Sequence, residues 1–303
     1  MPASATSRLA RLRAHATGEG HQKAYQAIES VPPASPIVPE PSPAQEQLEG
    51  AIFGKMYALR FIPHHRRDAS GFRPFGIRSI VPSSDKLVIE LETWSGYDEF
   101  VSNIMPGIEQ VEDGSTPEIH GVPGLRFRSH DLGLSLFRPG LAGEVVVAGV
   151  TVDEWEAAHA SGFSDQHAPG CPATSHPAQW TQAEKNHAPS MLAQFGALAV
   201  KHERDDHILQ SAMLRRIGLL NRLGSRSTTT WRKAGEPGIV IEVFQNEYDI
   251  ESYDSFIGEM TSPRMSPQLT CVYRRASPNE GYRVIEFTSS SSQGSLQIRL
   301  RSA

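Results

Sequence analysis

Four side chains that can bind a metal lie close together in the stretch "KHERDDH". On a helix, His202 and Asp206 share one face, and so do Glu203 and His207, because each pair is four residues apart. Either pair could hold one divalent cation. His202 and His207 lie about 140° apart around a helix, so one ion would not bind both. The sequence therefore suggests one alternative function, a metal-dependent hydrolase that uses His202, Glu203, Asp206 and His207. The simpler interpretation of the same residues is a solvated polar face.

A second group of metal-binding residue types lies upstream, in a segment rich in proline. His167, Cys171, His176 and His187 are all residue types that bind zinc. Three, four and ten residues separate successive members, and this spacing matches no known zinc module. We expect these residues to belong to a loop. No cofactor is predicted, and a divalent metal remains the open alternative.

Basic residues cluster in three stretches, although the net charge of −5 gives no global attraction to nucleic acid. In "FIPHHRRDASGFRPFGIRS" the cations alternate with phenylalanines, a mixture suited to phosphates and stacked bases. The residues predicted to contact DNA or RNA are Arg8, Arg11, Arg13, His64, His65, Arg66, Arg67, Arg73, Arg215 and Arg216. The alternative is a set of basic surface loops whose aromatic residues anchor them to the core.

The first residues, "SRLARLRAHATGEGHQKAYQAIESV", predict two short helices around a turn that contains Gly18 and Gly20. This stretch resembles the helix-turn segment found at the start of many actinobacterial mobile-element proteins. The resemblance implies a bacterial protein of regulatory or mobile-element type. It covers about two dozen residues and assigns no functional residue.

Common catalytic motifs are missing from the sequence. It contains no glycine-rich dinucleotide motif after a strand, no phosphate-binding G-x-x-x-x-G-K-[ST], no H-E-x-x-H and no G-x-S-x-G. These absences lower the odds of several common enzyme classes without deciding whether the protein is an enzyme.

Two distant stretches follow one pattern. "LVIELETWSGYDEFVSNIM" begins at Leu87, and "IVIEVFQNEYDIESYDSFIGEM" begins at Ile239. Each predicts a strand and then a helix, and three more strands follow in both halves. We therefore expect an α+β protein with two related β-α-β-β-β units joined by a helical middle segment. A short helical N-terminus and a Pro-rich linker precede them.

Changes in composition divide the chain into six segments. These are a helical N-terminal segment (1–31), a Pro-rich linker (32–44), a first α+β unit (45–160), a His/Pro-rich loop (161–190), a long helix (191–224) and a second α+β unit (225–303). A composition of 39% hydrophobic residues is enough for a substantial core.

The chain has two cysteines and no apolar run long enough to cross a bilayer. The sequence thus predicts a cytoplasmic protein without a membrane partner. The main functional hypothesis is a non-enzymatic binding protein that contacts DNA or RNA. The alternatives are the metal-dependent hydrolase and a protein–protein interaction scaffold built on the duplicated units.

Overall fold

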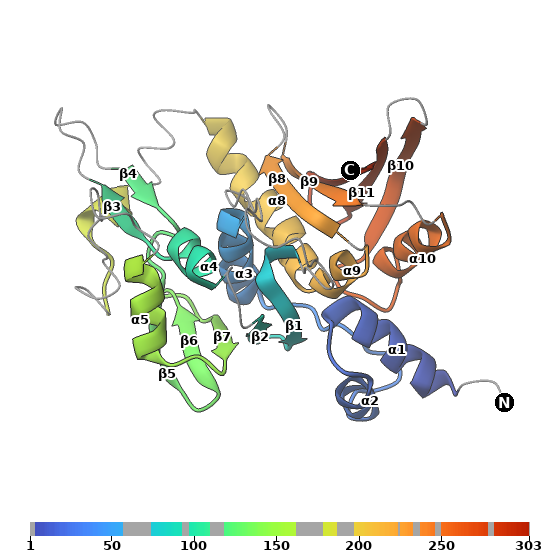
Figure 1. The fold of residues 1–303 in the computed structure, drawn as a ribbon, viewed down its shortest axis with the longest axis horizontal. Helices are drawn as coiled ribbons and strands as arrows, with labels where there is room; N and C mark the ends of the chain where they lie inside the picture. The colour runs from blue at the N-terminus through green and yellow to red at the C-terminus, as the bar shows by residue number, and fades with distance from the viewer. Residues whose placement is uncertain are drawn as a thin grey trace.

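The computed structural model contains two five-stranded sheets, a two-stranded hairpin and the helices around them (Figure 1). The predicted α+β class is confirmed. The residues that the structure describes are 4–56, 74–92, 97–109, 118–161, 178–186, 197–223, 225–232, 237–245, 250–277 and 282–302. Within them, no helix is both long and apolar enough to cross a membrane.

The first sheet follows the strand order β1-β2-β7-β6-β5. Its strands are β1 (Ile77–Pro82), β2 (Lys86–Leu91), β5 (Arg126–His130), β6 (Gly133–Phe137) and β7 (Glu144–Ala148). β2 and β7 run parallel, and the other neighbours are antiparallel. The connection after β2 contains α4 (Tyr97–Ile104) and a small hairpin of β3 (Gly107–Glu109) and β4 (Glu118–His120), which was not predicted. A short 3-10 turn, η1 (Pro74–Gly76), precedes β1, and α5 (Val152–Ser161) follows β7.

The second sheet has the order β10-β11-β12-β9-β8. Read from its other end, as β8-β9-β12-β11-β10, it has the same connectivity as β1-β2-β7-β6-β5 of the first sheet. Its strands are β8 (Ser225–Arg232), β9 (Gly238–Gln245), β10 (Leu269–Ser277), β11 (Tyr282–Ser289) and β12 (Ser295–Ser302). Here β9 and β12 are the parallel pair, and α10 (Ile250–Met260) follows β9. This shared topology is what a duplicated unit would produce. That the two units arose by duplication stays a prediction.

Apolar residues of the paired central strands form the buried interior of both sheets. In the first sheet, Leu87 and Ile89 of β2 pair with Val145 and Val147 of β7. All four side chains are fully buried. The corresponding positions of the second sheet are also buried: Ile239, Ile241, Leu296 and Ile298. Val146 and Val240 lie on the opposite faces of β7 and β9 and are also buried, so these two strands are covered on both sides.

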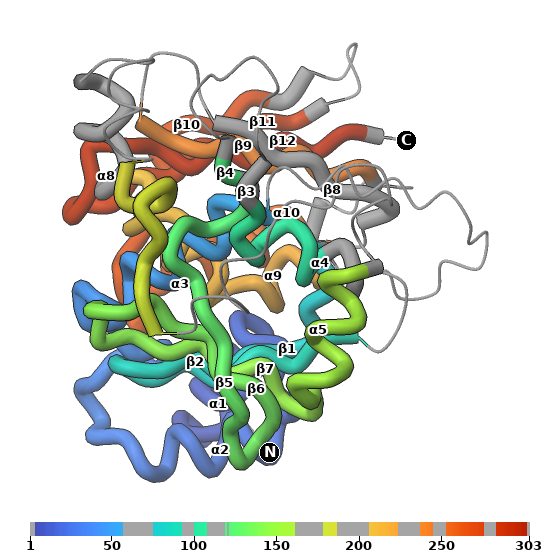
Figure 2. The backbone as a smooth tube through the Cα atoms, turned by 90° about the vertical axis from the view of Figure 1, so that its left-hand side faces the viewer, coloured from blue at the N-terminus to red at the C-terminus, as the bar shows by residue number. Residues whose placement is uncertain are grey.

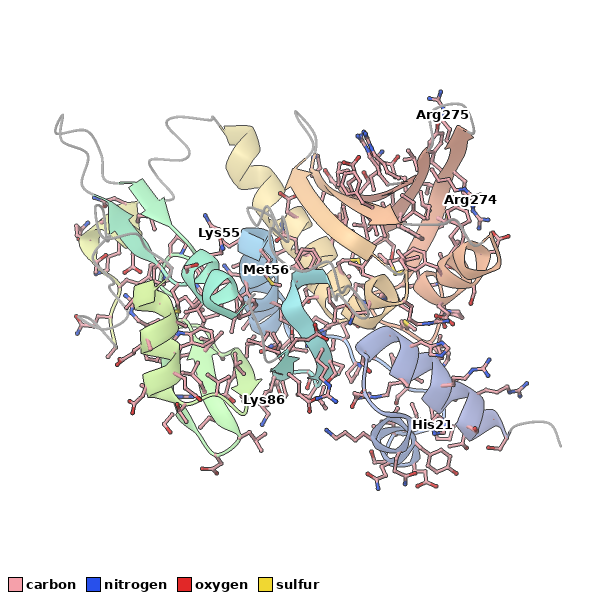
Figure 3. The ribbon with its side chains drawn as sticks, viewed as in Figure 1. His21, Lys55, Met56, Lys86, Arg274 and Arg275 are labelled. Carbon is pink, nitrogen blue, oxygen red and sulfur yellow. The ribbon has the colours of Figure 1, made fainter. Side chains whose placement is uncertain are left out.

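Helices α3 (Pro43–Met56) and α8 (Ala197–Leu214) pack against each other between the two sheets (Figures 1 and 2). They cross at Gly50, where an added Cβ would lie 2.6 Å from the Cα of His207. Only a glycine permits this approach. Met56, at the end of α3, is fully buried (Figure 3), and one apolar core joins both halves.

The N-terminal segment forms a helical hairpin of α1 (Ala5–Thr17) and α2 (His21–Glu29). Gly18 ends α1 in the left-handed conformation, with φ of 74°. The hairpin lies against β1 and against α9 (Ile217–Asn221). An added Cβ on Gly218 of α9 would lie 2.4 Å from the backbone nitrogen of Gly18. The two helices of the N-terminal segment therefore pack closely onto the rest of the protein.

The Pro-rich segment 32–44 is not a free spacer. Ile37 and Val38 are buried, and the Ile37 N–H donates to the carbonyl of Arg264 at 2.7 Å. Val38 also forms an isolated bridge with Met265. The segment begins with a turn in which the Ser35 N–H donates to the carbonyl of Pro32 at 2.9 Å. Ile37 and Val38 then attach it to the core.

The long helix expected over 191–224 is interrupted within its described residues. α8 ends at Leu214 and α9 begins at Ile217, so the helix breaks at Arg215 and Arg216. Strand β8, which follows, was not predicted because its sequence "SRSTTTWR" has few apolar residues. In the described part of the chain it pairs with β9 alone and so forms an edge of the sheet.

Candidate binding surface around Arg128

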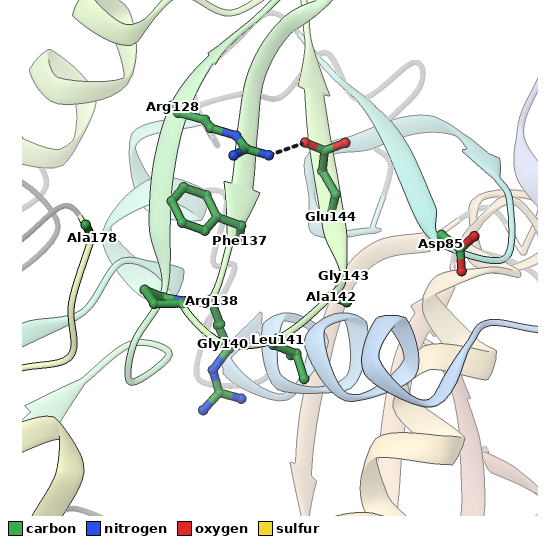
Figure 4. Close-up of a pocket in the computed structure, with 11 residues that line it drawn as sticks. Asp85, Arg128, Phe137, Arg138, Gly140, Leu141, Ala142, Gly143, Glu144 and Ala178 are labelled. Atoms are coloured by element: carbon green, nitrogen blue, oxygen red, sulfur yellow. Dashed lines mark hydrogen bonds and ion pairs between the residues drawn. The ribbon is translucent and has the colours of Figure 1, made fainter.

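A pocket of about 530 Å³ lies beside the turn that joins β6 to β7 (Figure 4). Charged and aromatic side chains line it together with a glycine-containing turn. Its lining residues are Asp85, Arg128, Phe137, Arg138, Pro139, Gly140, Leu141, Ala142, Gly143, Glu144 and Ala178. Two cationic and two anionic side chains meet here, so the lining has a mixed charge.

Arg128 of the pocket lining is both oriented by its neighbours and exposed. Its guanidinium carbon lies 4.8 Å from the ring centre of Phe137, and its Nη2 donates to Glu144 at 3.2 Å. The side chain is nevertheless 62% exposed. Glu144 is the hydrogen-bond partner of this guanidinium among the described residues, so further N–H donors face solvent. An arginine that is oriented in advance but still accessible is well suited to bind a partner.

Glu144 holds Arg128 in place as an ionised carboxylate. Ser135 Oγ donates to its Oε1 at 2.6 Å, and the strand pairing places Ser135 opposite Arg128. Partial burial favours the neutral acid, but the hydrogen bonds from Ser135 and Arg128 outweigh it and lower the pKa of Glu144 below its ordinary value. The Arg128–Glu144 pair therefore persists at neutral pH.

A second arginine of the pocket lining, Arg138, stacks on an aromatic ring. The guanidinium carbon of Arg138 lies 4.8 Å from the ring centre of Trp180. The Trp180 indole N–H donates to the carbonyl of Pro139 at 3.0 Å. Gly124 allows the close contact with this ring, since an added Cβ would lie 2.5 Å from it. Trp180 thus fastens the segment 178–186 to the β6–β7 turn.

A buried ion pair anchors the same segment to β5. Arg126 and Glu184 have fully buried side chains and are joined by two hydrogen bonds of 2.7 and 2.9 Å. Glu184 also accepts hydrogen bonds from the backbone N–H groups of Gly124 and Thr181. Burial opposes its ionisation, but Arg126 and these N–H groups lower its pKa. The position of the pocket wall therefore depends on this pair.

The structure separates the residues predicted to contact nucleic acid. Arg8 and Arg11 are exposed and lie three residues apart on α1, whose sequence contains no acidic residue. His64, His65, Arg66, Arg67 and Arg73 lie outside the described residues. Of the described candidates, Arg8 and Arg11 are therefore the ones at the surface.

Arg13, Arg215 and Arg216 lie inside the protein, which corrects their assignment as surface contacts. They are 3%, 0% and 0% exposed. Arg13 donates to Glu19 and to the carbonyl of Ile37. Arg216 donates to the carbonyls of Ala212 and Pro267. These cations hold backbone segments together and are not accessible to phosphates.

Arg215 is the centre of the largest of these buried networks. It donates from Nε and Nη2 to both oxygens of Glu49, each at 2.7 Å, and both side chains are fully buried. Further donors reach the carbonyls of Pro39 and Ser83. Ser211 and Gln45 also donate to Glu49. The network joins α3, the end of α8, the Pro-rich segment and the β1–β2 turn.

The predicted metal ligands lie on α8, but the structure describes only two of their side chains. Asp206 is buried, and its Oδ1 accepts a hydrogen bond from the Gly238 N–H at 2.9 Å. His207 is 8% exposed and packs against Gly50. The side chains of His202 and Glu203 lie outside the described set. Among described residues, no group of three or more His, Cys, Asp or Glu side chains is placed to hold a metal. The whole upstream group also lies outside the described residues: His167, Cys171, His176 and His187.

Sequence reasoning did not single out Arg128, Phe137, Arg138, Glu144 or Trp180. The available signal was weak: "RFRSH" and "LFRPGLAGE" place arginines and aromatics on both sides of a Pro-Gly turn. No protein-family model, curated protein or solved structure matches this chain.

Proposed function

We propose that this is a non-enzymatic cytoplasmic binding protein that contacts another protein through the pocket around Arg128. The observation that carries the proposal is the Arg128 side chain, which is stacked on Phe137, paired with Glu144 and still 62% exposed. Arginine and aromatic residues supply much of the binding energy in protein interfaces. The mixed charge of the lining suits a protein partner better than a uniformly anionic nucleic acid.

A random-peptide library selected on the immobilised full-length protein tests this proposal. We expect a class of enriched peptides whose affinity falls at least ten-fold in both Arg128→Ala and Phe137→Ala. Arg8→Ala is the matched control, because it removes an exposed arginine from another surface. If no selected peptide loses affinity in Arg128→Ala, the pocket is not the contact surface.

Nucleic-acid contact is the second candidate function, and the exposed Arg8 and Arg11 on α1 favour it. It keeps the regulatory or mobile-element role inferred from the N-terminal sequence. Anisotropy titrations with labelled duplex and single-stranded DNA and RNA test it. Binding should weaken steeply between about 50 and 200 mM salt, because contacts with phosphates release bound counterions. It should also weaken in the Arg8→Ala/Arg11→Ala variant. Affinity that is independent of salt would rule this candidate out.

A further inference from the structure

β10 forms a free edge of the second sheet among the described residues. The strand order places it beside β11 alone, so its other side presents main-chain N–H and C=O groups without a strand partner there. Val272 and Tyr273, in the middle of the strand, are 55% and 45% exposed. An open edge with exposed apolar side chains has the features that β-strand addition uses.

The corresponding strand of the first sheet is covered. β5 occupies the same end position, and the segment 178–186 lies against its beginning through the Arg126–Glu184 pair and Trp180. The described part of the chain supplies no such segment for β10. A covering segment would therefore have to come from outside the described residues.

Charge determines which segment fits the edge of β10. Arg274 and Arg275 are exposed and point away from the rest of the protein (Figure 3). Arg274 makes a 3.4 Å contact with the exposed Asp254, and Arg275 has no ion-pair partner among the described residues. Two copies of β10 would bring four arginines together, and like charges on adjacent strands repel. The bulge between Cys271 and Tyr273 interrupts the strand, so the regular part of the edge covers residues 273–277.

We propose that β10 binds an extended acidic segment of another protein, which adds to the sheet as a further strand. Its backbone pairs along residues 273–277, beyond the bulge, and its carboxylates lie near Arg274 on one face of the sheet and near Arg275 on the other. This surface is distinct from the Arg128 pocket and goes beyond the proposed function.

The test uses the full-length protein and two labelled ten-residue probes. One carries adjacent pairs of glutamates between valines and threonines, so that carboxylates face both sides of the added strand, and the other has lysine in place of each glutamate. Anisotropy measures the affinity of each probe, and hydrogen exchange measures the protection of residues 269–277. Arg274→Glu/Arg275→Glu reverses the charge of the edge. Arg8→Glu/Arg11→Glu is the matched control, because it changes the net charge by the same amount on α1.

We expect the glutamate probe to bind at least ten-fold more tightly than the lysine probe and to slow exchange in β10. The Arg274→Glu/Arg275→Glu variant should lose at least ten-fold in affinity for the glutamate probe, and the control should lose less than two-fold. Binding without protection of β10 would overturn the proposal, as would an equal loss in the control. A dimer of the free protein with a protected β10 would also overturn it, since the occupant would then be a second copy.

Discussion

Breaking the buried pair of Glu49 and Arg215 should destabilise the protein more than removing any surface ion pair. Both side chains are fully buried, and Glu49 accepts hydrogen bonds from Arg215, Ser211 and Gln45. Glu49→Leu leaves the Arg215 cation buried without a carboxylate, which costs about 3–5 kcal/mol. Arg215→Met leaves the Glu49 anion in the same situation and should cost a similar amount. A loss of this size is a large fraction of the roughly 5–15 kcal/mol that stabilises a typical folded protein.

The double variant Glu49→Leu/Arg215→Met separates the charge effect from a general packing defect. It leaves no unpaired ion, and a buried ion pair can often be replaced by apolar residues at little cost. Ser211, Gln45 and two backbone carbonyls still lose partners, so we expect the double variant to cost about 1–3 kcal/mol. Urea unfolding followed by circular dichroism measures all three variants. Arg128→Ala is the control, and its exposed pair should contribute about 1 kcal/mol or less. If the double variant loses the sum of the two single losses, the pair is not coupled and the reasoning fails.

Three further changes test other parts of the fold. Gly50→Ala should lower the urea midpoint, because its Cβ would lie 2.6 Å from the Cα of His207; an unchanged midpoint would contradict the crossing of α3 and α8. Glu184→Gln should remove an acid-sensitive contribution: the folded pKa of Glu184 lies below its ordinary value of 4.5, so its stabilisation is present above that value and is lost as the pH falls through the folded pKa. The stability of the wild type should therefore fall more steeply below pH 4.5 than that of Glu184→Gln, and parallel curves would refute this. Burial and the neighbouring Arg215 lower the pKa of Arg216, so the folded state disfavours this charge, and Arg216→Met should cost less than Arg215→Met in urea unfolding. A loss in Arg216→Met as large as that in Arg215→Met would refute this.

The sequence by itself determined where most strands and helices lie, because those elements follow local periodicity. The apolar runs in "LVIEL" and "IVIEV" predicted the strands β2 and β9. The turn expected at Gly18 and Gly20 separates α1 from α2. Strand β8 and the β3–β4 hairpin were missed, since their sequences carry too little apolar pattern to stand out.

Only the tertiary structure decided which charged residues belong to the interior and which to the surface. Arg215 and Arg8 look alike in the sequence, but Arg215 meets Glu49, which is 166 residues away in the chain, whereas Arg8 stays in solvent. The Arg128 pocket likewise joins strands, a turn and the segment 178–186 that are distant in the chain. A charged side chain is buried or exposed according to the partners that the fold brings to it. The local sequence does not show which residues these partners are, because they are distant in the chain.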